Sequence, residues 1–367
     1  MIKQIQIWFV FTLVMVSIKF FDALFINKSL VNYLQYLGII IAVLLSIPYM
    51  LPKNRGFVFS MQLIFVTIVV SVTMSYAYWD QNLIQGLVAT APFMIIIFFF
   101  YLLHIKFSIK VLEKIIVCFG ILYVLLFFYQ FIKSPEVLFR SAWGDAFDES
   151  RGIVRIVFPG GGVFILSSFI ALTKLTSQER PRWFWATLTI LGLIIPVMQV
   201  TRQFIAGMVL IYLFHVIRHL SFLKKITIII SFALIGFYLL NSNIPVIQGI
   251  MQSSKSDVNE GADYIRVLAG EYFLTDFSPN IITKIFGNGV PNTGESGYGL
   301  FTEMLSVNQY YYLSDVGIIA VYAMFGIGAI LGFIIIWVKS FTIPLPKEYY
   351  YLKYYLWFLL LTSLTWY

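Results

Sequence analysis

Long apolar runs alternate with short polar segments along almost the whole chain. A helix needs about 20 predominantly apolar residues to cross the hydrocarbon core of a bilayer, and the runs have about this length. They predict about eleven membrane-spanning helices. The runs cover residues 5–25, 31–51, 57–78, 83–103, 111–132, 153–173, 183–200, 203–220, 226–241, 310–337 and 349–367. The last run reaches Tyr367 with no polar segment after it, so we expect a partial final helix or a chain that continues.

The composition strengthens this prediction. Hydrophobic residues make up 60% of the chain and charged residues only 11%, with a mean hydropathy of +0.88. Soluble domains are roughly a quarter charged, so this chain cannot cover a water-exposed surface. The first run has no small-residue cleavage site behind it and predicts a first span, not a removable signal peptide. We therefore predict an all-α, polytopic integral membrane protein with a single membrane domain over residues 1–367.

The charges and the cysteine exclude several classes of protein. The net charge is +8, but Lys and Arg are scattered between apolar runs, which argues against a nucleic-acid-binding face. The one cysteine, Cys118, lies inside an apolar run, so a disulfide framework and a Cys-ligated metal site are both excluded.

The positions of Lys and Arg predict the orientation. If the N-terminus is cytoplasmic, the short inside loops hold most of the Lys and Arg residues, as the positive-inside rule requires. His104, His215 and His219 then lie at cytoplasmic helix ends, which leaves no histidine for an outside metal site. Two outside segments exceed a short turn, residues 133–153 and the much longer 242–309, and chemistry is expected there.

The long outside segment carries signals for two short helices. Asp263 is suited to cap a helix over residues 264–274. Ser278 and Pro279, followed by Gly287, are typical of the start and the end of a second helix. We expect both helices to lie at the membrane interface.

Arginines on the outside run against the topology rule and need a reason. Arg202 follows Thr201, which is suited to cap the next helix, so an anion that docked there would meet backbone N–H groups and a guanidinium. The alternative to this binding role is that Arg202 is a snorkelling interface residue. Arg266 lies about one turn from Glu271, and the alternative to a binding role is a salt bridge on the helix surface.

Two further features have two interpretations each, the pair Arg151 and Arg155 and a Gly-Asn-Gly segment. Arg140 is also on the outside, and Arg151 and Arg155 precede a Pro-Gly-Gly-Gly segment at residues 159–162. These last two arginines either bind a ligand or anchor the interface. The Gly-Asn-Gly segment at residues 287–289 predicts first of all a helix stop and a tight turn.

The chemistry follows from these arginines and from what the sequence lacks. It has no phosphate-binding glycine loop, no D-x-D pair and no H-E-x-x-H motif. A donor that is itself membrane-anchored, such as a lipid-linked diphosphate sugar, suits such a site. Arginine can neutralise a diphosphate leaving group without a metal ion, and an acid could deprotonate the acceptor hydroxyl.

Over residues 185–335 the chain resembles the O-antigen polymerase and O-antigen ligase superfamily. The resemblance rests on the order of Thr201-Arg202-Gln203, Arg266-Val267-Leu268-Ala269-Gly270, Gly287-Asn288-Gly289, Asn308-Gln309-Tyr310 and Leu313-Ser314-Asp315-Val316-Gly317-Ile318-Ile319. It implies a helical glycosyltransferase of the GT-C type in the bacterial inner membrane, with the site at the outer face. The implied activity is metal- and cofactor-independent polymerisation of undecaprenyl-diphosphate-linked repeat units of O-antigen, capsule or exopolysaccharide.

The resemblance also assigns roles and partners. It implies Arg202 and Arg266 as the two essential arginines, and the absence of histidine from residues 306–310 favours a polymerase over a ligase. The candidates for the general base are Asp315, which ranks slightly first, Glu271 and Glu303. The expected substrate-binding residues are Arg151, Arg155, Gln203, Tyr264, Asn288, Asn308, Gln309 and Tyr310. The implied partners are the lipid-linked glycan donor, a glycan acceptor, membrane lipid and other polysaccharide-assembly proteins.

Two other classes of function stay open. One is a flippase or transporter for a polyprenyl-linked glycan, in which the arginines would hold the diphosphate during passage. The other is a structural or receptor role for the segment at residues 242–309.

Overall fold

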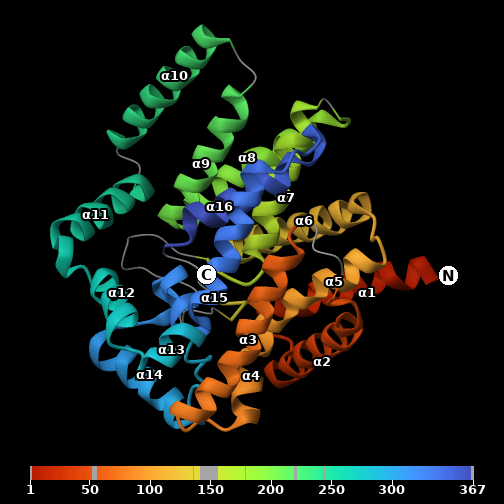
Figure 1. The fold of residues 1–367 in the computed structure, drawn as a ribbon. Coiled ribbons are helices and arrows are strands. Elements are labelled where there is room, and N and C mark those ends of the chain that lie inside the picture. The colour runs from red at the N-terminus through yellow and green to blue at the C-terminus, as the bar shows by residue number, and fades with distance from the viewer. Residues whose placement is uncertain are drawn as a thin grey trace. The chain divides into compact units, whose positions relative to one another are not determined.

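The computed structural model describes residues 2–51, 56–134, 136–140, 156–177, 179–218, 221–242 and 245–364. Within these ranges the chain is helical, and its β-structure is limited to an isolated bridge between Ala23 and Phe139. The chain divides into two compact units (Figure 1), which are described separately below. The predicted all-α class is confirmed.

The first unit contains residues 1–28, 109–261 and 345–361. Its helices are α1 (Ile2–Ser17), α6 (Ile109–Lys133), α7 (Gly161–Thr176), α8 (Arg182–Met198), α9 (Arg202–Ile217), α10 (Phe222–Leu240), α11 (Pro245–Glu260) and α16 (Tyr350–Thr362), with the 3-10 turns η1 (Lys19–Asp22) and η7 (Lys347–Tyr349). Helix α7 packs between α6 and α8, and α9 packs against α8. Accordingly α7 is the most buried helix of this unit: nine of its ten positions from Phe164 to Thr173 are buried.

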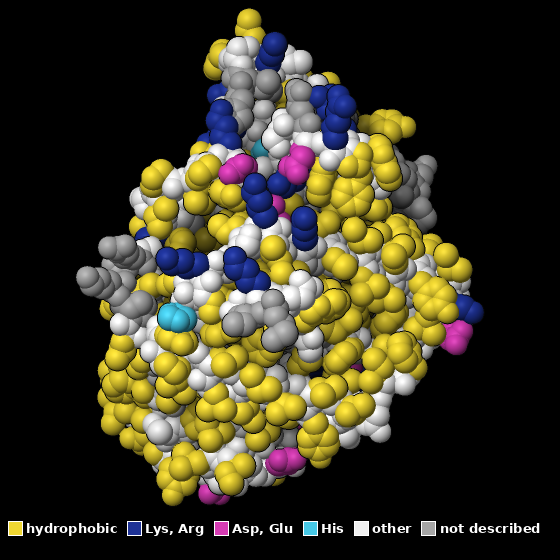
Figure 2. All heavy atoms as spheres, turned by 90° about the vertical axis from the view of Figure 1, so that its right-hand side faces the viewer, with side chains coloured by type: hydrophobic (Ala, Val, Ile, Leu, Met, Phe, Trp, Pro, Cys, Tyr) yellow, Lys and Arg dark blue, Asp and Glu magenta, His cyan; other side chains and the backbone are white. Residues whose placement is uncertain are grey.

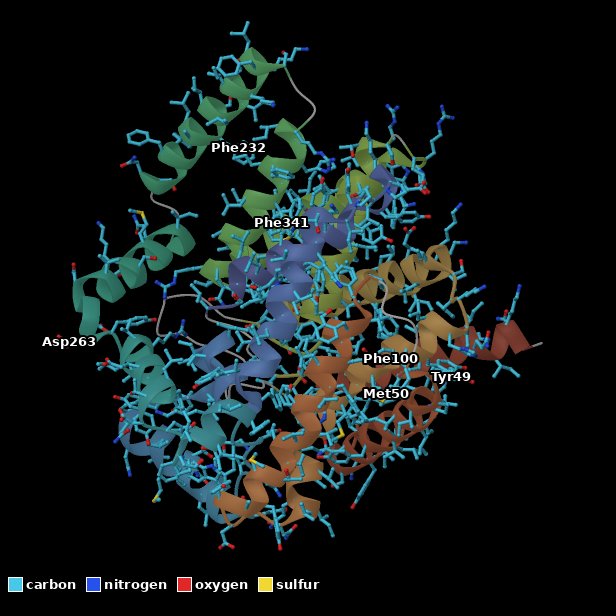
Figure 3. All side chains as sticks on the ribbon, in the orientation of Figure 1. Tyr49, Met50, Phe100, Phe232, Asp263 and Phe341 are labelled. Atoms are coloured by element: carbon cyan, nitrogen blue, oxygen red, sulfur yellow. The ribbon has the colours of Figure 1, made fainter. Side chains whose placement is uncertain are left out.

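The second unit contains residues 29–108, 262–344 and 362–367. Its helices are α2 (Lys28–Ser46), α3 (Val58–Tyr78), α4 (Leu83–Met94), α5 (Phe98–His104), α12 (Ile265–Thr275), α13 (Ile281–Phe286), α14 (Gly297–Gln309) and α15 (Ile318–Thr342), with the 3-10 turns η2 (Ile47–Tyr49), η3 (Ile95–Ile97) and η6 (Leu313–Asp315). Helices α3 and α15 lie side by side (Figure 1) and form its main packing interface. A second apolar cluster joins buried Phe65 and Phe100 to Tyr49 and Met50. Tyr49, Met50 and Phe100 are labelled in Figure 3 and lie close together there.

Six helical segments of the described chain are long and apolar enough to cross a membrane. They are Lys3–Asp22, Lys28–Tyr49, Val58–Tyr78, Leu83–His104, Ile109–Lys133 and Ile318–Thr342. Many of their side chains face outward, and Figure 2 shows a largely hydrophobic face on which Lys and Arg gather around a few acidic residues. A polytopic helical membrane protein is therefore the class of this structure. The remaining predicted runs also contain helices, of which α7, α8 and α9 are shorter, and eleven spans stay a prediction.

Several predicted helix boundaries are wrong for local reasons. The run at residues 310–337 becomes helical only at Ile318, because Tyr310 adopts a left-handed φ of 58° and η6 intervenes. Asp263, labelled in Figure 3, lies in the 3-10 turn η5 (Gly261–Asp263), and the N-cap of α12 is Tyr264. The N-cap of α13 is Asn280, not Ser278, whereas Gly287 ends the helix as predicted. The long segment also contains α11 and α14 in addition to the two predicted short helices.

Arg140, in the first unit, is paired with an acid and with backbone carbonyl groups. Arg140 lies 3.3 Å from the Asp22 carboxylate and donates hydrogen bonds to the carbonyl oxygens of Ala23, Leu24 and Ile26. Its guanidinium thus pairs with the irregular backbone that follows η1. This network gives the outside arginine at residue 140 a structural role.

Helix α15 is broken near its middle, and a turn from another segment pairs with the break. Gly326 has φ 76°, outside the helical region. In the turn before it, the carbonyl oxygens of Ala323 and Met324 accept hydrogen bonds of 2.9 and 2.8 Å from the backbone N–H groups of Asn288 and Gly289. Such pairing is required because a broken helix exposes backbone groups that lipid cannot satisfy.

We predict that Gly326→Ala lowers the thermal unfolding midpoint of the detergent-solubilised protein. The positive φ alone costs about 1–3 kcal/mol for a residue with a side chain, and a Cβ atom would overlap the backbone of Ile285 and Gly287. Gly236→Ala in α10 is the control, because nothing lies near the position of its new Cβ atom. Equal midpoints for the two variants would contradict the close backbone approach at Gly326.

Candidate functional site

A cavity of about 420 Å³ opens in the second unit. Helices α4, α12, α14 and α15 each contribute to its wall, together with the segments before α14 and around η6. The lining residues are Phe93, Phe273, Val290, Pro291, Thr293, Thr302, Glu303, Ser306, Tyr311, Tyr312, Leu313, Ser314 and Met324. The volume lies in the range of small-molecule sites, roughly 300–1,000 Å³.

The cavity wall combines aromatic rings, hydroxyl groups and one carboxylate. Helix α14 presents Thr302, Glu303 and Ser306 on one side, since residues three and four apart share a helix face. The Glu303 side chain is exposed, so its carboxylate is accessible to a ligand. Rings with polar tips and short hydroxyl side chains can contact a polar, ring-shaped ligand by stacking and by hydrogen bonding.

An ion pair lies beside this wall. Arg266 Nη2 is 3.5 Å from Asp315 Oδ2, and the two side chains are 36% and 27% exposed. Asp315 ends η6, directly after the cavity-lining Ser314, whose hydroxyl donates to Asp315 Oδ1 at 3.3 Å. A long, partly exposed pair of this kind contributes about 0–1 kcal/mol to stability. An incoming anion could therefore replace Asp315 at Arg266 with little loss of stability.

Helix α12 packs against the aromatic side chains of the cavity wall. The Tyr272 ring packs against Tyr311 with 5.5 Å between centroids, and Tyr311 lines the cavity. Partial burial, together with the nearby charge of Asp276, raises the pKa of the Tyr272 phenol above its ordinary value. Tyr272 therefore stays protonated at neutral pH and is available only as a hydrogen-bond donor or acceptor, not as a base.

Two buried amide side chains fix the segment that precedes α14. Asn288 accepts a hydrogen bond of 2.8 Å from the Trp79 indole, and its amide nitrogen donates to Ser278 Oγ and Ala323 O, each at 2.8 Å. Gln81 donates to Val290 O at 2.9 Å and accepts from Ser296 Oγ at 2.8 Å. Both amides are fully buried, so their contacts position the loop that contributes Val290, Pro291 and Thr293 to the cavity.

Sequence reasoning missed Gln81, Trp79 and the lining hydroxyls. Gln81 and Trp79 directly follow α3, so a polar residue at the end of a span was the available signal. Their partners are about 210 residues away in the sequence, at separations of 209 to 215, and no local pattern indicates such a pairing.

The other predicted residues of the second unit lie at its surface. Glu271 is exposed on α12 and is absent from the cavity lining, and its predicted partner Arg266 pairs with Asp315 instead. Tyr264 is half-buried at the N-cap of α12. Three exposed residues form the end of α14, namely Asn308, Gln309 and Tyr310.

The remaining predicted residues belong to the first unit. Arg202 begins α9, is half-buried, and donates a hydrogen bond of 3.1 Å to Ser254 Oγ; Gln203 follows it in the first turn. Thr201 occupies the N-cap position, but its hydroxyl is directed to Gln199 O at 3.4 Å and does not cap the helix. Arg151 and Arg155, and also His219, lie outside the described residues.

Neither the comparisons with known proteins nor a search for metal-binding side chains assigns a function to this cavity. No family model, curated protein or solved structure matches this chain. In the ranges that the structure describes, no group of three His, Cys, Asp or Glu side chains is placed to hold a metal ion. The resemblance to the O-antigen polymerases and ligases therefore stays a prediction.

We predict that Asn288→Asp destabilises the protein by about 3 kcal/mol, because it replaces the donating amide by a buried carboxylate that faces the Ala323 carbonyl. Asn308→Asp makes the same chemical change at an exposed residue and is expected to shift stability by less than about 0.5 kcal/mol. Chemical unfolding in mixed micelles measures both. If the two variants are equally stable, Asn288 does not hold the loop.

Proposed function

We propose that this protein polymerises lipid-linked oligosaccharide repeat units, by glycosyl transfer from a polyprenyl-diphosphate donor at the outer face of the bacterial inner membrane. The observation that supports this proposal most directly is the cavity of the second unit, where the Glu303 carboxylate lies among hydroxyl and aromatic side chains next to the Arg266–Asp315 pair. This combination supplies both an acid–base group and a cation for a diphosphate. The apolar helices of the same unit support a donor with a lipid carrier, because such a carrier would reach the site from the bilayer.

The proposed role of Arg266 is to bind the diphosphate of the donor. Its guanidinium is about one-third exposed and shares only a long contact with Asp315. A diphosphate offers two negative oxygens to the same planar group, and such bidentate, charge-assisted hydrogen bonds are stronger than neutral ones. Arg266 would then stabilise the charge that develops on the leaving group. For Arg202, in the first unit, the essential role that the family resemblance implies remains a separate proposal.

The proposed role of Glu303 is to take the proton from the acceptor hydroxyl. As this proton moves to the carboxylate, the hydroxyl oxygen forms a bond to the anomeric carbon, and the bond from that carbon to the diphosphate oxygen breaks. The polyprenyl diphosphate leaves with the electron pair. Glu303 is favoured over Asp315 because Asp315 already faces a guanidinium, and over Glu271 because Glu271 is not part of the cavity wall.

We predict that Glu303→Gln lowers the rate of polymer formation by about 10²–10⁴-fold, the usual contribution of a general base. Arg266→Ala is expected to lower the rate by about 10²–10³-fold through lost charge stabilisation. The assay uses purified protein in proteoliposomes, lipid-linked repeat units as the only substrate, and a chelator to exclude metal ions. Product length on a gel measures the activity.

Glu271→Gln is the matched control, because it removes an exposed carboxylate of the same unit outside the cavity. Polymer of normal length from the Glu303 and Arg266 variants would refute the site. Transfer only to a different lipid or protein acceptor would indicate a ligase. Movement of the intact lipid-linked unit across the proteoliposome membrane, without transfer, would indicate a flippase.

A further inference from the structure

A second cavity, of about 620 Å³, lies in the first unit between α6, α7 and α8. One end is charged and carries Lys110, Lys114 and Lys174. The other end is apolar and is formed by residues 117, 118, 121 and 170. The proposed glycosyl transfer uses none of these groups.

The acids in the charged end are already engaged. Lys174 lies 3.2 Å from a Glu113 oxygen and 2.9 Å from a Glu179 oxygen. The other oxygen of Glu113 accepts a hydrogen bond of 2.7 Å from the Tyr351 hydroxyl. Glu348, the third acid of the lining, accepts a hydrogen bond from Tyr349. The three carboxylates of the lining balance its three ammonium groups in total, but of the three lysines only Lys174 forms an ion pair in the described parts of the chain.

Lys110 and Lys114 are the two lysines of the cavity that form no direct ion pair in the described parts of the chain. Both are exposed, and within the described parts of the chain neither forms an ion pair. They lie in the first two turns of the 25-residue helix α6, where the helix dipole disfavours cations. A bound anion would reverse this, since it would be attracted both by the two ammonium groups and by the helix N-terminus. The geometry therefore favours a negatively charged ligand.

The apolar end continues from the same lysines along one helix face. Val117, Cys118 and Ile121 follow Lys114 at intervals of three, four and seven residues, and Ile170 of α7 faces the same cavity. Trp185 completes the wall, and its indole nitrogen is buried without an acceptor among the described residues. Tryptophan is enriched at the level of the lipid head groups, where one part of a ligand is polar and the rest apolar.

We propose that this cavity binds an anionic phospholipid. Its phosphate would contact Lys110 and Lys114, and an acyl chain would lie along Val117, Cys118 and Ile121. By the positive-inside rule this end of α6 is cytoplasmic, where anionic head groups attract basic residues near the membrane surface. Basic pockets between membrane helices on this side are suited to such head groups.

The test is native mass spectrometry of the full chain, released from micelles that contain phosphatidylglycerol or phosphatidylcholine. We expect the wild-type protein to retain phosphatidylglycerol preferentially. Each lysine near the surface contributes about fivefold in affinity, so Lys110→Gln combined with Lys114→Gln should weaken phosphatidylglycerol binding by about 25-fold. The matched control is Lys224→Gln with Lys225→Gln, which removes two lysines of α10 that do not line the cavity. Equal loss in both variants would overturn the proposal.

Cys118 provides an independent measurement, because it is exposed, lines the cavity and is the one cysteine of the chain. Phosphatidylglycerol should slow its labelling by N-ethylmaleimide, and phosphatidylcholine or inorganic phosphate should not. Protection by inorganic phosphate alone would show a phosphate site without a lipid, and would overturn the proposal. So would unchanged labelling with phosphatidylglycerol.

Discussion

Hydrogen bonds between the turn at residues 287–289 and the broken helix α15 organise the second unit, because they satisfy backbone carbonyls that lipid cannot. The close approach requires glycine on both sides, at Gly287 and Gly326, where an added Cβ atom would overlap the opposite backbone. Asn288, the residue after Gly287, donates a hydrogen bond to Ala323 O of α15 and accepts one from the Trp79 indole. The chain leaves this turn in a fixed direction, and its next residues, Val290 and Pro291, form cavity wall.

The same constraint accounts for the polar groups of the first unit. Only 11% of the residues of this chain are charged. A buried charge needs a partner, because the desolvation penalty of an unpaired charge destabilises the fold. Glu113, only 7% exposed, meets Lys174 and Tyr351. His215 is placed between Thr176 and the Tyr354 hydroxyl, at 3.0 and 2.7 Å. Polar side chains in this unit thus connect helices. Lys110 and Lys114, which form no such ion pair in the described chain, are exposed at the cavity between α6, α7 and α8.

The sequence predicts the helices better than it predicts the site, and the physical reason is the range of the interactions. Span length depends on consecutive apolar residues, so the run at 57–78 corresponds to α3 at Val58–Tyr78 within one residue. The start of α15 depends on a left-handed Tyr310, which hydropathy does not encode. Arg266 was recognised from its conflict with the topology rule, but its partner Asp315 is 49 residues away and not on its own helix. The cavity brings together α4 and α14, which no local pattern relates.

The weakness of the Arg266–Asp315 pair is consistent with a function in binding. A buried arginine held by a short bidentate carboxylate would be difficult to displace, whereas this pair is joined by one contact of 3.5 Å and both side chains are partly exposed. Asp315 therefore orients the guanidinium near the cavity in the absence of ligand without competing strongly for it. Under the proposed function, a diphosphate, with more charge and two acceptor oxygens, would bind the same guanidinium more tightly than one carboxylate oxygen does. The base proposed for the same reaction, Glu303, is independent of this contact, because it lies on α14 and forms no part of the pair.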